Sequence, residues 1–321
     1  MYYLLSKQLG GIVGATFREE ISVGVVGWRQ TLNSRVVVWR ARSYGKALAV
    51  VAVSAFALGI TALPSGATTN PTNWPYAVGS PGYDVSYPQC SNPSSYTPSP
   101  SSSPQFAIIG IDGGRPFNTN GCTQKEWGAA LGAGVTSISI YINTGYSGAY
   151  AHDITSTCAA DNTPYKVGSK LAQAWQIGCS EADFALNTAI SDGVNPNVPT
   201  GNQVGGGMWW ADVETGNSWS TNTSLNQATI QGVVTELAAP TTSTLSPEGG
   251  LPVGIYSNTT FWKKITGNTS WAPTSPIISP TPQWYAGSSC TSFAGSNPVW
   301  LAQTGTSSVG DPDTACPLSA T

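Results

Sequence analysis

The chain has 321 residues, of which only 9% are charged, and a formal net charge of −3. Residues 1–67 hold seven of the 13 basic and two of the 16 acidic residues, so the remainder carries 6 basic and 14 acidic residues and a net charge of −8. Such a surface excludes nucleic acid and anionic lipid as partners recognised by charge alone.

The N-terminal part has the pattern of an export signal. Three basic residues precede an uncharged apolar run, Ala47–Leu63, and small residues follow it at positions 65–67. This predicts a signal peptide over residues 39–67 and a secreted protein without membrane contact after cleavage. Residues 1–38 are interpreted either as the product of an upstream, mis-assigned start or as a cytoplasmic tail on an uncleaved anchor.

The rest of the chain is predicted to form a short linker, residues 68–81, and one domain over residues 82–321. Its size is close to the roughly 250 residues typical of a (β/α)₈ barrel. All six cysteines lie in this part, and three disulfides are expected in an exported chain. Fifteen pairings are possible; the ones that close short loops are favoured. These are Cys90–Cys122, Cys158–Cys179 and Cys290–Cys316. No CxxC motif occurs, which argues against a structural zinc site.

Apolar runs that end in polar residues alternate with helix signals along the domain. The predicted strands are Gly82–Ser86, Phe106–Asp112, Ser137–Asn143, Met208–Glu214, Val253–Ser257, Gln283–Ala286 and Val299–Gln303. The predicted helices run from Thr123 to about Gly132, from Ser180 to near Gly193, from Ser224 to about Ala238, and over Thr260–Ile265. Long connections are expected at Ser91–Pro104 and Thr144–Gly178. Alternation of this kind implies a parallel sheet. The fold class is therefore α/β, a TIM-type (β/α) barrel with reduced helices in its C-terminal part.

Polar residues stand at the carboxyl ends of these strands, where barrel enzymes place their sites. The residues are Asp84, Asp112, Asn143, Asp212, Glu214 and Gln303. Alternate residues of a strand point to the same face, so the side chains of Asp212 and Glu214 are expected to project together. Two carboxylates on one face are the minimum apparatus for cleaving a glycosidic bond. The structural alternative is an acid pair that caps the following helix.

In the catalytic interpretation, Glu214 is the general acid. Repulsion from Asp212 and Asp84, together with desolvation by Trp209 or Trp210, would raise its pKa. The single histidine, His152, is expected to be a surface loop residue. A Ser-His-Asp triad or a zinc hydrolase finds no support in the remaining sequence.

Several short motifs, in order, resemble glycoside hydrolase family 25, the lysozymes of the Chalaropsis/cellosyl type, and its secreted actinobacterial branch. The motifs are Gly82-Tyr83-Asp84-Val85-Ser86, Ala211-Asp212-Val213-Glu214, Gly254-Ile255-Tyr256-Ser257, Trp284-Tyr285-Ala286, Trp300-Leu301-Ala302-Gln303 and Asp311. The resemblance implies hydrolysis of the bond between N-acetylmuramic acid and N-acetylglucosamine in peptidoglycan. Glu214 takes the acid/base role, and Asp212 orients a 2-acetamido group that can itself act as nucleophile. Asp84 and Asp311 are the supporting carboxylates, although Asp313 aligns with the closing position as well.

The expected function is thus that of a secreted, monomeric peptidoglycan hydrolase without cofactor or metal. The substrate is expected to contact Asp112, Asn143, Trp210, Tyr256, Trp284 and Gln303. Two alternatives stay open. One is a catalytically silent barrel that binds cell-wall glycan, and the other is a hydrolase of a different hexosamine polymer.

Overall fold

The computed structural model defines most of the predicted domain. The described residues are 75–90, 103–135, 137–160, 163–196, 207–239 and 251–317. The predicted leader, the signal peptide, the first half of the linker and most of the Ser91–Pro104 connection lie outside them. Within the described residues, no helix is both long enough and apolar enough to span a membrane.

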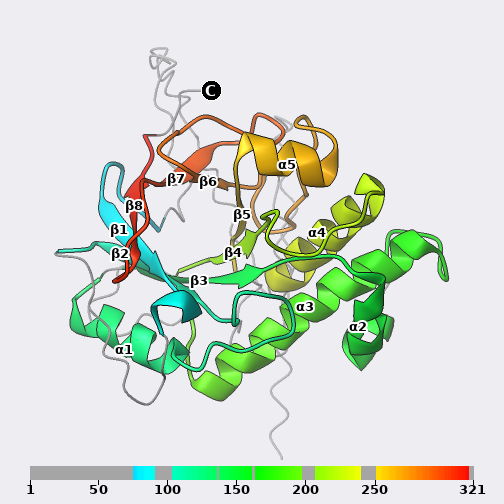
Figure 1. The fold of residues 1–321 in the computed structure, drawn as a ribbon, viewed down its shortest axis with the longest axis horizontal. Coiled ribbons are helices and arrows are strands. Elements are labelled where there is room, and N and C mark those ends of the chain that lie inside the picture. Colours follow the sequence, from blue (N-terminus) through cyan, green and yellow to red (C-terminus); the bar gives the residue numbers. More distant parts are fainter. Residues whose placement is uncertain are drawn as a thin grey trace, which may run out of the picture. The chain divides into compact units, whose positions relative to one another are not determined.

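Eight strands form a closed barrel in sequential order, as Figure 1 shows. They are β1 (Pro81–Val85), β2 (Phe106–Gly110), β3 (Ser137–Asn143), β4 (Trp209–Asp212), β5 (Val253–Ser257), β6 (Gln283–Ala286), β7 (Val299–Gln303) and β8 (Asp311–Ala315). Strands β1 to β7 run parallel to one another. Strand β8 is antiparallel to both β7 and β1, and it closes the barrel. The predicted α/β barrel is confirmed; its eighth strand was not predicted.

The helices lie outside the barrel and become scarce toward the C-terminus (Figure 1). They are α1 (Thr123–Gly132), α2 (Ser156–Ala160), α3 (Lys170–Asp192), α4 (Thr223–Ala238) and α5 (Thr259–Thr266), with 3-10 turns η1 (Tyr87–Gln89) and η2 (Gly148–Asp153). No described helix follows β6 or β7. The expected loss of helical cover is therefore confirmed.

The start of α3 differs from the prediction. The helix begins at Lys170 rather than near Ser180, because Ser169 caps it by accepting a hydrogen bond from the backbone N–H of Ala172. Gly178 does not end the helix, because its missing side chain serves helix packing. A Cβ there would lie 1.9 Å from the carbonyl oxygen of Thr229 on α4. The glycine lets the two helices approach closely.

The two faces of each strand serve two different cores. On β4, Trp209 and Ala211 belong to the core between sheet and helices, whereas Trp210 belongs to the barrel interior. The interior is filled mainly by large aromatic and aliphatic side chains: Tyr76, Phe106, Ile108, Met208, Trp210, Trp284, Trp300 and Leu301. The barrel is thus a packed core rather than a pore, and ligands can enter only at its rim.

Three disulfides join the pairs that short loop closure favoured. They are Cys90–Cys122, Cys158–Cys179 and Cys290–Cys316. The first ties the residue after η1 to the residue that precedes α1, and the second ties α2 to α3. The connection Thr144–Gly178, expected to be a loop, holds η2, α2 and the first half of α3.

Candidate active site

The carboxyl ends of the parallel strands meet the amino end of β8 at one rim. Because β8 is antiparallel, its first residue, Asp311, lies opposite Asp84 near the end of β1. Asn143 and Asp212 are neighbours across β3 and β4. Because β8 runs in the reverse direction, its Asp311 joins Asp84, Asp212 and Glu214 at this rim.

A cavity of about 290 Å³ opens at this rim. Its walls contain Asp84, Ser86, Pro88, Gln89, Tyr141, Asp212, Glu214, Tyr256, Trp284, Gln303, Thr306 and Asp311. All four predicted catalytic carboxyl groups line it, together with three of the six predicted substrate contacts. The strand-end pattern identified four of these residues, Asp84, Asp212, Glu214 and Gln303, and the family resemblance added Tyr256, Trp284 and Asp311.

Gln303 and Tyr256 organise one side of this cavity. The side-chain amide of Gln303 donates a hydrogen bond to Asp84 Oδ2 at 2.8 Å and lies 3.5 Å from Asp311 Oδ2. The hydroxyl of Tyr256 donates to Gln303 Oε1 at 2.8 Å, which fixes the orientation of the amide. A second contact holds Asp311, whose Oδ1 accepts from the backbone N–H of Ser307 at 2.6 Å.

The other side of the cavity is formed by the pair at the end of β4. Asp212 is 5% exposed, and its Oδ2 accepts a hydrogen bond from the side-chain amide of Asn143. Its Oδ1 is buried and has no hydrogen-bond partner among the described residues. Glu214 is half-buried, and its backbone carbonyl oxygen accepts a hydrogen bond from the indole N–H of Trp219 at 2.7 Å. One carboxyl group is held rigidly, and the other is more open to solvent.

Burial raises the pKa of every carboxyl group in the cavity. Desolvation is the main cause for Asp84, whose pKa rises to about 7, and the charge of Asp311 adds to it. Burial raises the pKa of Glu214, and the repulsion expected from the sequence acts between Glu214 and its neighbours Asp212 and Asp84. After burial, the charge of Glu214 is the next cause that raises the pKa of Asp212.

Three predicted substrate contacts do not line the cavity. Trp210 is completely buried in the barrel interior, where its indole N–H donates to the hydroxyl of Tyr76 at 2.9 Å. Alternation along β4 does place Trp210 on the same face as Asp212, but one layer deeper. Asp112 accepts a hydrogen bond from the backbone N–H of Asn143, and the side-chain amide of Asn143 donates to the carboxyl group of Asp212.

Asp311 and Asp313 take different places on β8. Asp311 lines the cavity, whereas Asp313 is 2% exposed and accepts a hydrogen bond from the indole N–H of Trp284 at 2.8 Å. Desolvation raises the pKa of Asp313 well above its usual range, and the charge of Asp84 adds to the shift. Asp311 therefore occupies the closing position of the cavity, and Asp313 supports its floor.

Sequence reasoning missed five residues of the cavity wall: Ser86, Pro88, Gln89, Tyr141 and Thr306. Tyr141 could have been found, because it stands two residues before Asn143 and shares its strand face. The others belong to η1 and to the loop after β7, which meet where Gln89 donates to the carbonyl oxygen of Ser307 at 3.3 Å. No local sequence pattern predicts that meeting.

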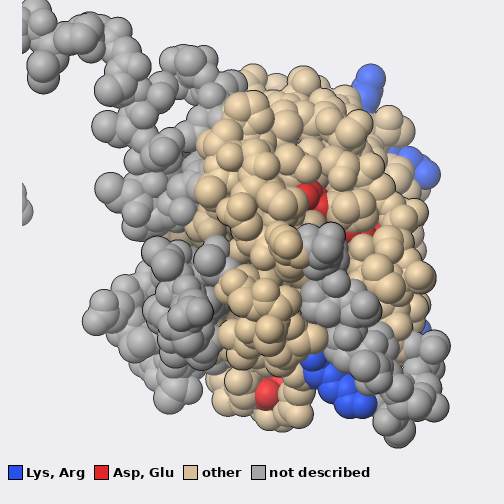
Figure 2. Space-filling view, turned by 90° about the vertical axis from the view of Figure 1, so that its left-hand side faces the viewer, with Lys and Arg blue, Asp and Glu red and all other residues tan. Residues whose placement is uncertain are grey.

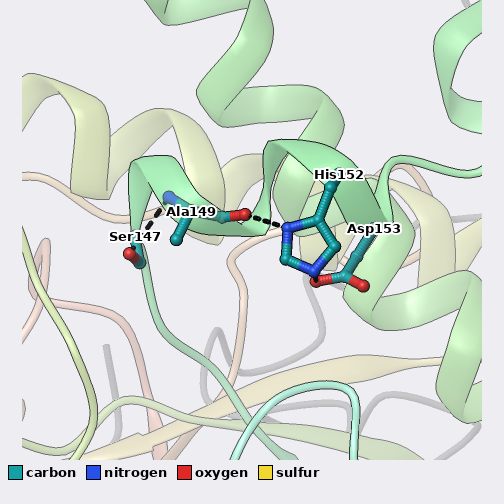
Figure 3. Close-up of polar contacts among 4 residues, drawn as sticks. All are labelled: Ser147, Ala149, His152 and Asp153. Atoms are coloured by element: carbon teal, nitrogen blue, oxygen red, sulfur yellow. Dashed lines mark hydrogen bonds and ion pairs between the residues drawn. The ribbon is translucent and has the colours of Figure 1, made fainter.

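His152 lies at the surface, as expected, and takes no part in a triad (Figure 3). One ring nitrogen contacts the carbonyl oxygen of Ala149, and the other lies 3.3 Å from Asp153. The hydroxyl of the nearby Ser147 instead accepts from the backbone N–H of Ala149. Among the described residues, the group that could offer three metal ligands is Cys158, Cys179 and Glu236, but the two sulfurs are joined in a disulfide.

Charge is scarce on the surface of the molecule. Figure 2 shows a face that is mostly neutral, on which acidic side chains appear only as small patches between uncharged residues. The fold and the site together define an α/β barrel with an acidic cavity at the carboxyl ends of its parallel strands. This is where barrel enzymes carry their active sites.

Comparison with known proteins gives a partial sequence match. A family model described as Lysozyme-like protein 1 matches residues 197–299, less than half of the chain. Among curated proteins, none matches the sequence.

Solved structures give distant likenesses. The modular autolysin LytC of Streptococcus pneumoniae is 12% identical with a TM-score of 0.42, and the match covers 74% of this chain and 46% of that one. The catalytic domain of endolysin ply40 from bacteriophage P40 of Listeria monocytogenes is 14% identical with a TM-score of 0.39, covering 75% and 95%. GHIP, a glycosyl hydrolase 25 of Streptococcus pneumoniae, is 12% identical with a TM-score of 0.41, covering 74% and 87%. Function is therefore argued from the site itself.

Proposed function

We propose that this protein is a lysozyme-like glycoside hydrolase that cleaves the glycan strands of peptidoglycan. The observation that carries the proposal is the gathering of Asp84, Asp212, Glu214 and Asp311 around one cavity. Four acids in so charge-poor a chain are costly to bury together, because each raises the free energy of ionising the next. A cavity that only bound sugar would have no need of a carboxyl group whose pKa burial raises, as it does for Glu214.

Glu214 acts as the general acid and base. Its raised pKa keeps the carboxyl group protonated to a higher pH than in an exposed glutamate, and its partial exposure leaves it accessible to a bound glycan. It donates its proton to the glycosidic oxygen as the bond between that oxygen and the anomeric carbon breaks. The resulting carboxylate then takes a proton from the water that attacks the anomeric carbon.

Asp212 orients the substrate. Its side chain lines the cavity, where a carboxyl oxygen can accept a hydrogen bond from the N–H of a 2-acetamido group. That contact directs the acetamido oxygen toward the anomeric carbon, where it displaces the leaving group in a substrate-assisted step. The proposal favours a hexosamine polymer as substrate, and the lysozyme-like match over residues 197–299, which includes Asp212 and Glu214, supports peptidoglycan.

The half-buried Asp311 supplies negative charge near the sugar ring as positive charge develops there, and Asp84, whose pKa is about 7, adds to it as pH rises through that value. Gln303 and Tyr256 hold these carboxyl groups in place, and Trp284 offers an aromatic edge at the cavity floor. We propose that the protein acts outside the cell as a monomer without a cofactor. Three disulfides fit an oxidising compartment.

The test is the release of soluble muropeptides from purified cell walls by the purified chain, compared with a Glu214→Gln variant of equal thermal stability. Reducing-end analysis of the products identifies the bond that is cut. We expect release by the wild type and a loss of about 10²–10⁴-fold in the variant. Binding to walls without release would favour a silent glycan-binding barrel. Cleavage of chitin but not of peptidoglycan would favour another hexosamine polymer.

A further inference from the structure

Asn143 contacts a catalytic carboxyl group rather than the cavity. It stands at the end of β3, directly across from Asp212 on β4, and its side-chain amide donates a hydrogen bond to Asp212 Oδ2. It is absent from the cavity wall, to which Asp212 and Glu214 both belong. Asp212 therefore presents its side chain to the cavity, and the partly exposed Asn143 acts on the cavity through its bond to that carboxyl group.

Asn143 is itself held by a second buried acid. Its backbone N–H donates to Asp112 Oδ2 at 2.6 Å, a short contact for a nitrogen donor. Asp112 follows the end of β2 and is 6% exposed. The contact fixes the last residue of β3 at the point where the strand leaves the sheet, so the amide of Asn143 keeps its direction.

The surroundings of Asp212 make this donor important. The titratable groups that face it are acids and phenols from several elements: Asp84, Asp112, Tyr141, Glu214 and Tyr256. Each of these acids disfavours the ionised form of Asp212. The amide of Asn143 favours the ionised form, and it occupies one oxygen while leaving Oδ1 directed elsewhere.

We infer that Asp112 and Asn143 form a positioning pair that sets the orientation of Asp212, an inference that rests on the proposed function. Asn143 holds Oδ2 and thereby fixes the plane of the carboxyl group that faces the cavity. Asp112 holds Asn143 through the backbone. Neither residue lines the cavity, in contrast to the substrate contact expected for them from the sequence. Each acts through the carboxyl group of Asp212.

The activity test uses soluble peptidoglycan oligosaccharides and full-chain variants. Three of them change the pair, namely Asn143→Ala, Asn143→Asp and Asp112→Asn, and a fourth is a control. Asn143→Ala removes the donor, and we expect kcat to fall by about 10²-fold with little change in KM, because misplaced catalytic groups slow the chemical step. Asn143→Asp keeps the shape of the side chain but replaces the amide with a carboxyl group. As pH falls, the introduced carboxyl group gains a proton that it can donate, so this variant recovers activity relative to Asn143→Ala.

The matched control is Asn187→Ala on α3, where the amide bonds to Asp183 on its own helix and lies outside the rim cavity. It should behave as the wild type. Asp112→Asn keeps an acceptor for the backbone of Asn143 and should cost less than Asn143→Ala. An Asn143→Ala variant within twofold of the wild type would overturn the inference, as would equal pH profiles for the two Asn143 variants.

A second measurement separates this inference from the proposed function. The carboxyl carbon of Asp212 can be titrated by NMR with ¹³C-labelled aspartate, and its signal is assigned by its loss in Asp212→Asn. Removing the donor in Asn143→Ala must raise the pKa of Asp212. A wild type inactive on every glycan would defeat the proposed function, and the titration would still decide whether Asn143 acts on Asp212. An unchanged pKa of Asp212 would overturn the pair.

Discussion

Two cavities in the described part of the chain have opposite character. The rim cavity measures about 290 Å³ and gathers four carboxyl groups. A larger cavity of about 450 Å³ lies outside the barrel between α1 and α3, and we call it the α1–α3 groove. It is lined by Thr119, Asn120, Gly121, Thr123, Gln124, Phe184, Asn187, Thr188, Ser191 and Asp192. Its walls are mostly hydroxyl and amide groups, with one acid.

The difference shows that size does not locate the chemistry. Asp192 is half-buried, and its raised pKa is moderated by a hydrogen bond from Thr123. It has no neighbouring acid in the groove wall. At the rim, the charges of Glu214 and Asp84 add to the desolvation of Asp212, and the three groups titrate as one system. Convergence of acids in a buried place, rather than cavity volume, marks the site.

The largest expected effect is a contrast between the same substitution in the two cavities. Asp212→Asn removes the acceptor proposed for the acetamido N–H and should lower kcat/KM on peptidoglycan fragments by about 10²–10³-fold. Asp192→Asn in the α1–α3 groove should leave kcat/KM unchanged. Comparable losses in both variants would mean that the groove takes part in catalysis and that the comparison is wrong.

The parts of the site that could be predicted are those with a local pattern. Apolar runs ending in Asp84, Asp212 and Gln303 gave both the strands and their functional ends, because the side-chain period of a strand and the rim of a parallel barrel are fixed by geometry. The disulfide pairs followed from loop length. These features need no knowledge of distant contacts.

The parts that could not be predicted depend on tertiary contacts. Strand β8 has the sequence Asp-Pro-Asp-Thr-Ala, and four of its five residues are of types depleted in strands. It is held by pairing on both sides, which local propensity does not reveal. Two further features likewise depend on how far along each strand the rim lies. They are the burial of Trp210 inside the barrel and the hydrogen bond from Asn143 to Asp212.

The Cys90–Cys122 disulfide joins the two regions, because Cys90 follows η1 at the rim and Cys122 lies between residues of the groove wall. Replacing both cysteines by alanine should cost about 3 kcal/mol of unfolding free energy in denaturant titration, from the loop that the bridge closes. Activity at permissive temperature should fall as well, because Pro88 and Gln89 line the rim cavity.

The matched control is the double alanine variant of Cys158 and Cys179. The disulfide that this variant removes ties α2 to α3, and neither cysteine lines the rim cavity. It should lose similar stability and keep its activity. If both double variants keep full activity while folded, η1 does not shape the rim cavity in the way its contacts indicate.

Asp84→Asn tests the electrostatic side of the comparison. The pKa of Asp84 is about 7 in the folded state against 3.8 for an unperturbed aspartate, so the folded protein binds the proton more tightly than the unfolded chain. Its contribution to stability is complete below pH 4 and is lost as pH rises through 7. The neutral asparagine removes this loss. Relative to the wild type, the variant should gain on the order of 3 kcal/mol between pH 4 and pH 8, measured by chemical denaturation.

Asp192→Asn in the groove serves as the reference for that measurement. Its carboxyl group is more exposed and has no acid beside it, so its stability difference should change much less with pH. Equal pH dependence of stability in the two variants would show that folding raises the pKa of Asp84 no more than that of the half-buried Asp192.

The smallest effect is expected from Tyr256→Phe. The substitution removes one hydroxyl that donates to Gln303 Oε1, while the ring still packs on Trp284 with centroids 4.4 Å apart. Gln303 then loses the contact that fixes its amide, and its bond to Asp84 weakens. One hydrogen bond is worth about 1 kcal/mol, which predicts a loss of about fivefold in kcat/KM. Tyr285→Phe on the same rim side provides the control, because Tyr285 packs against Phe293 and does not line the cavity. A loss in the Tyr285 variant as large as in the Tyr256 variant would mean that the chain of contacts from Tyr256 through Gln303 to Asp84 does not position the acid.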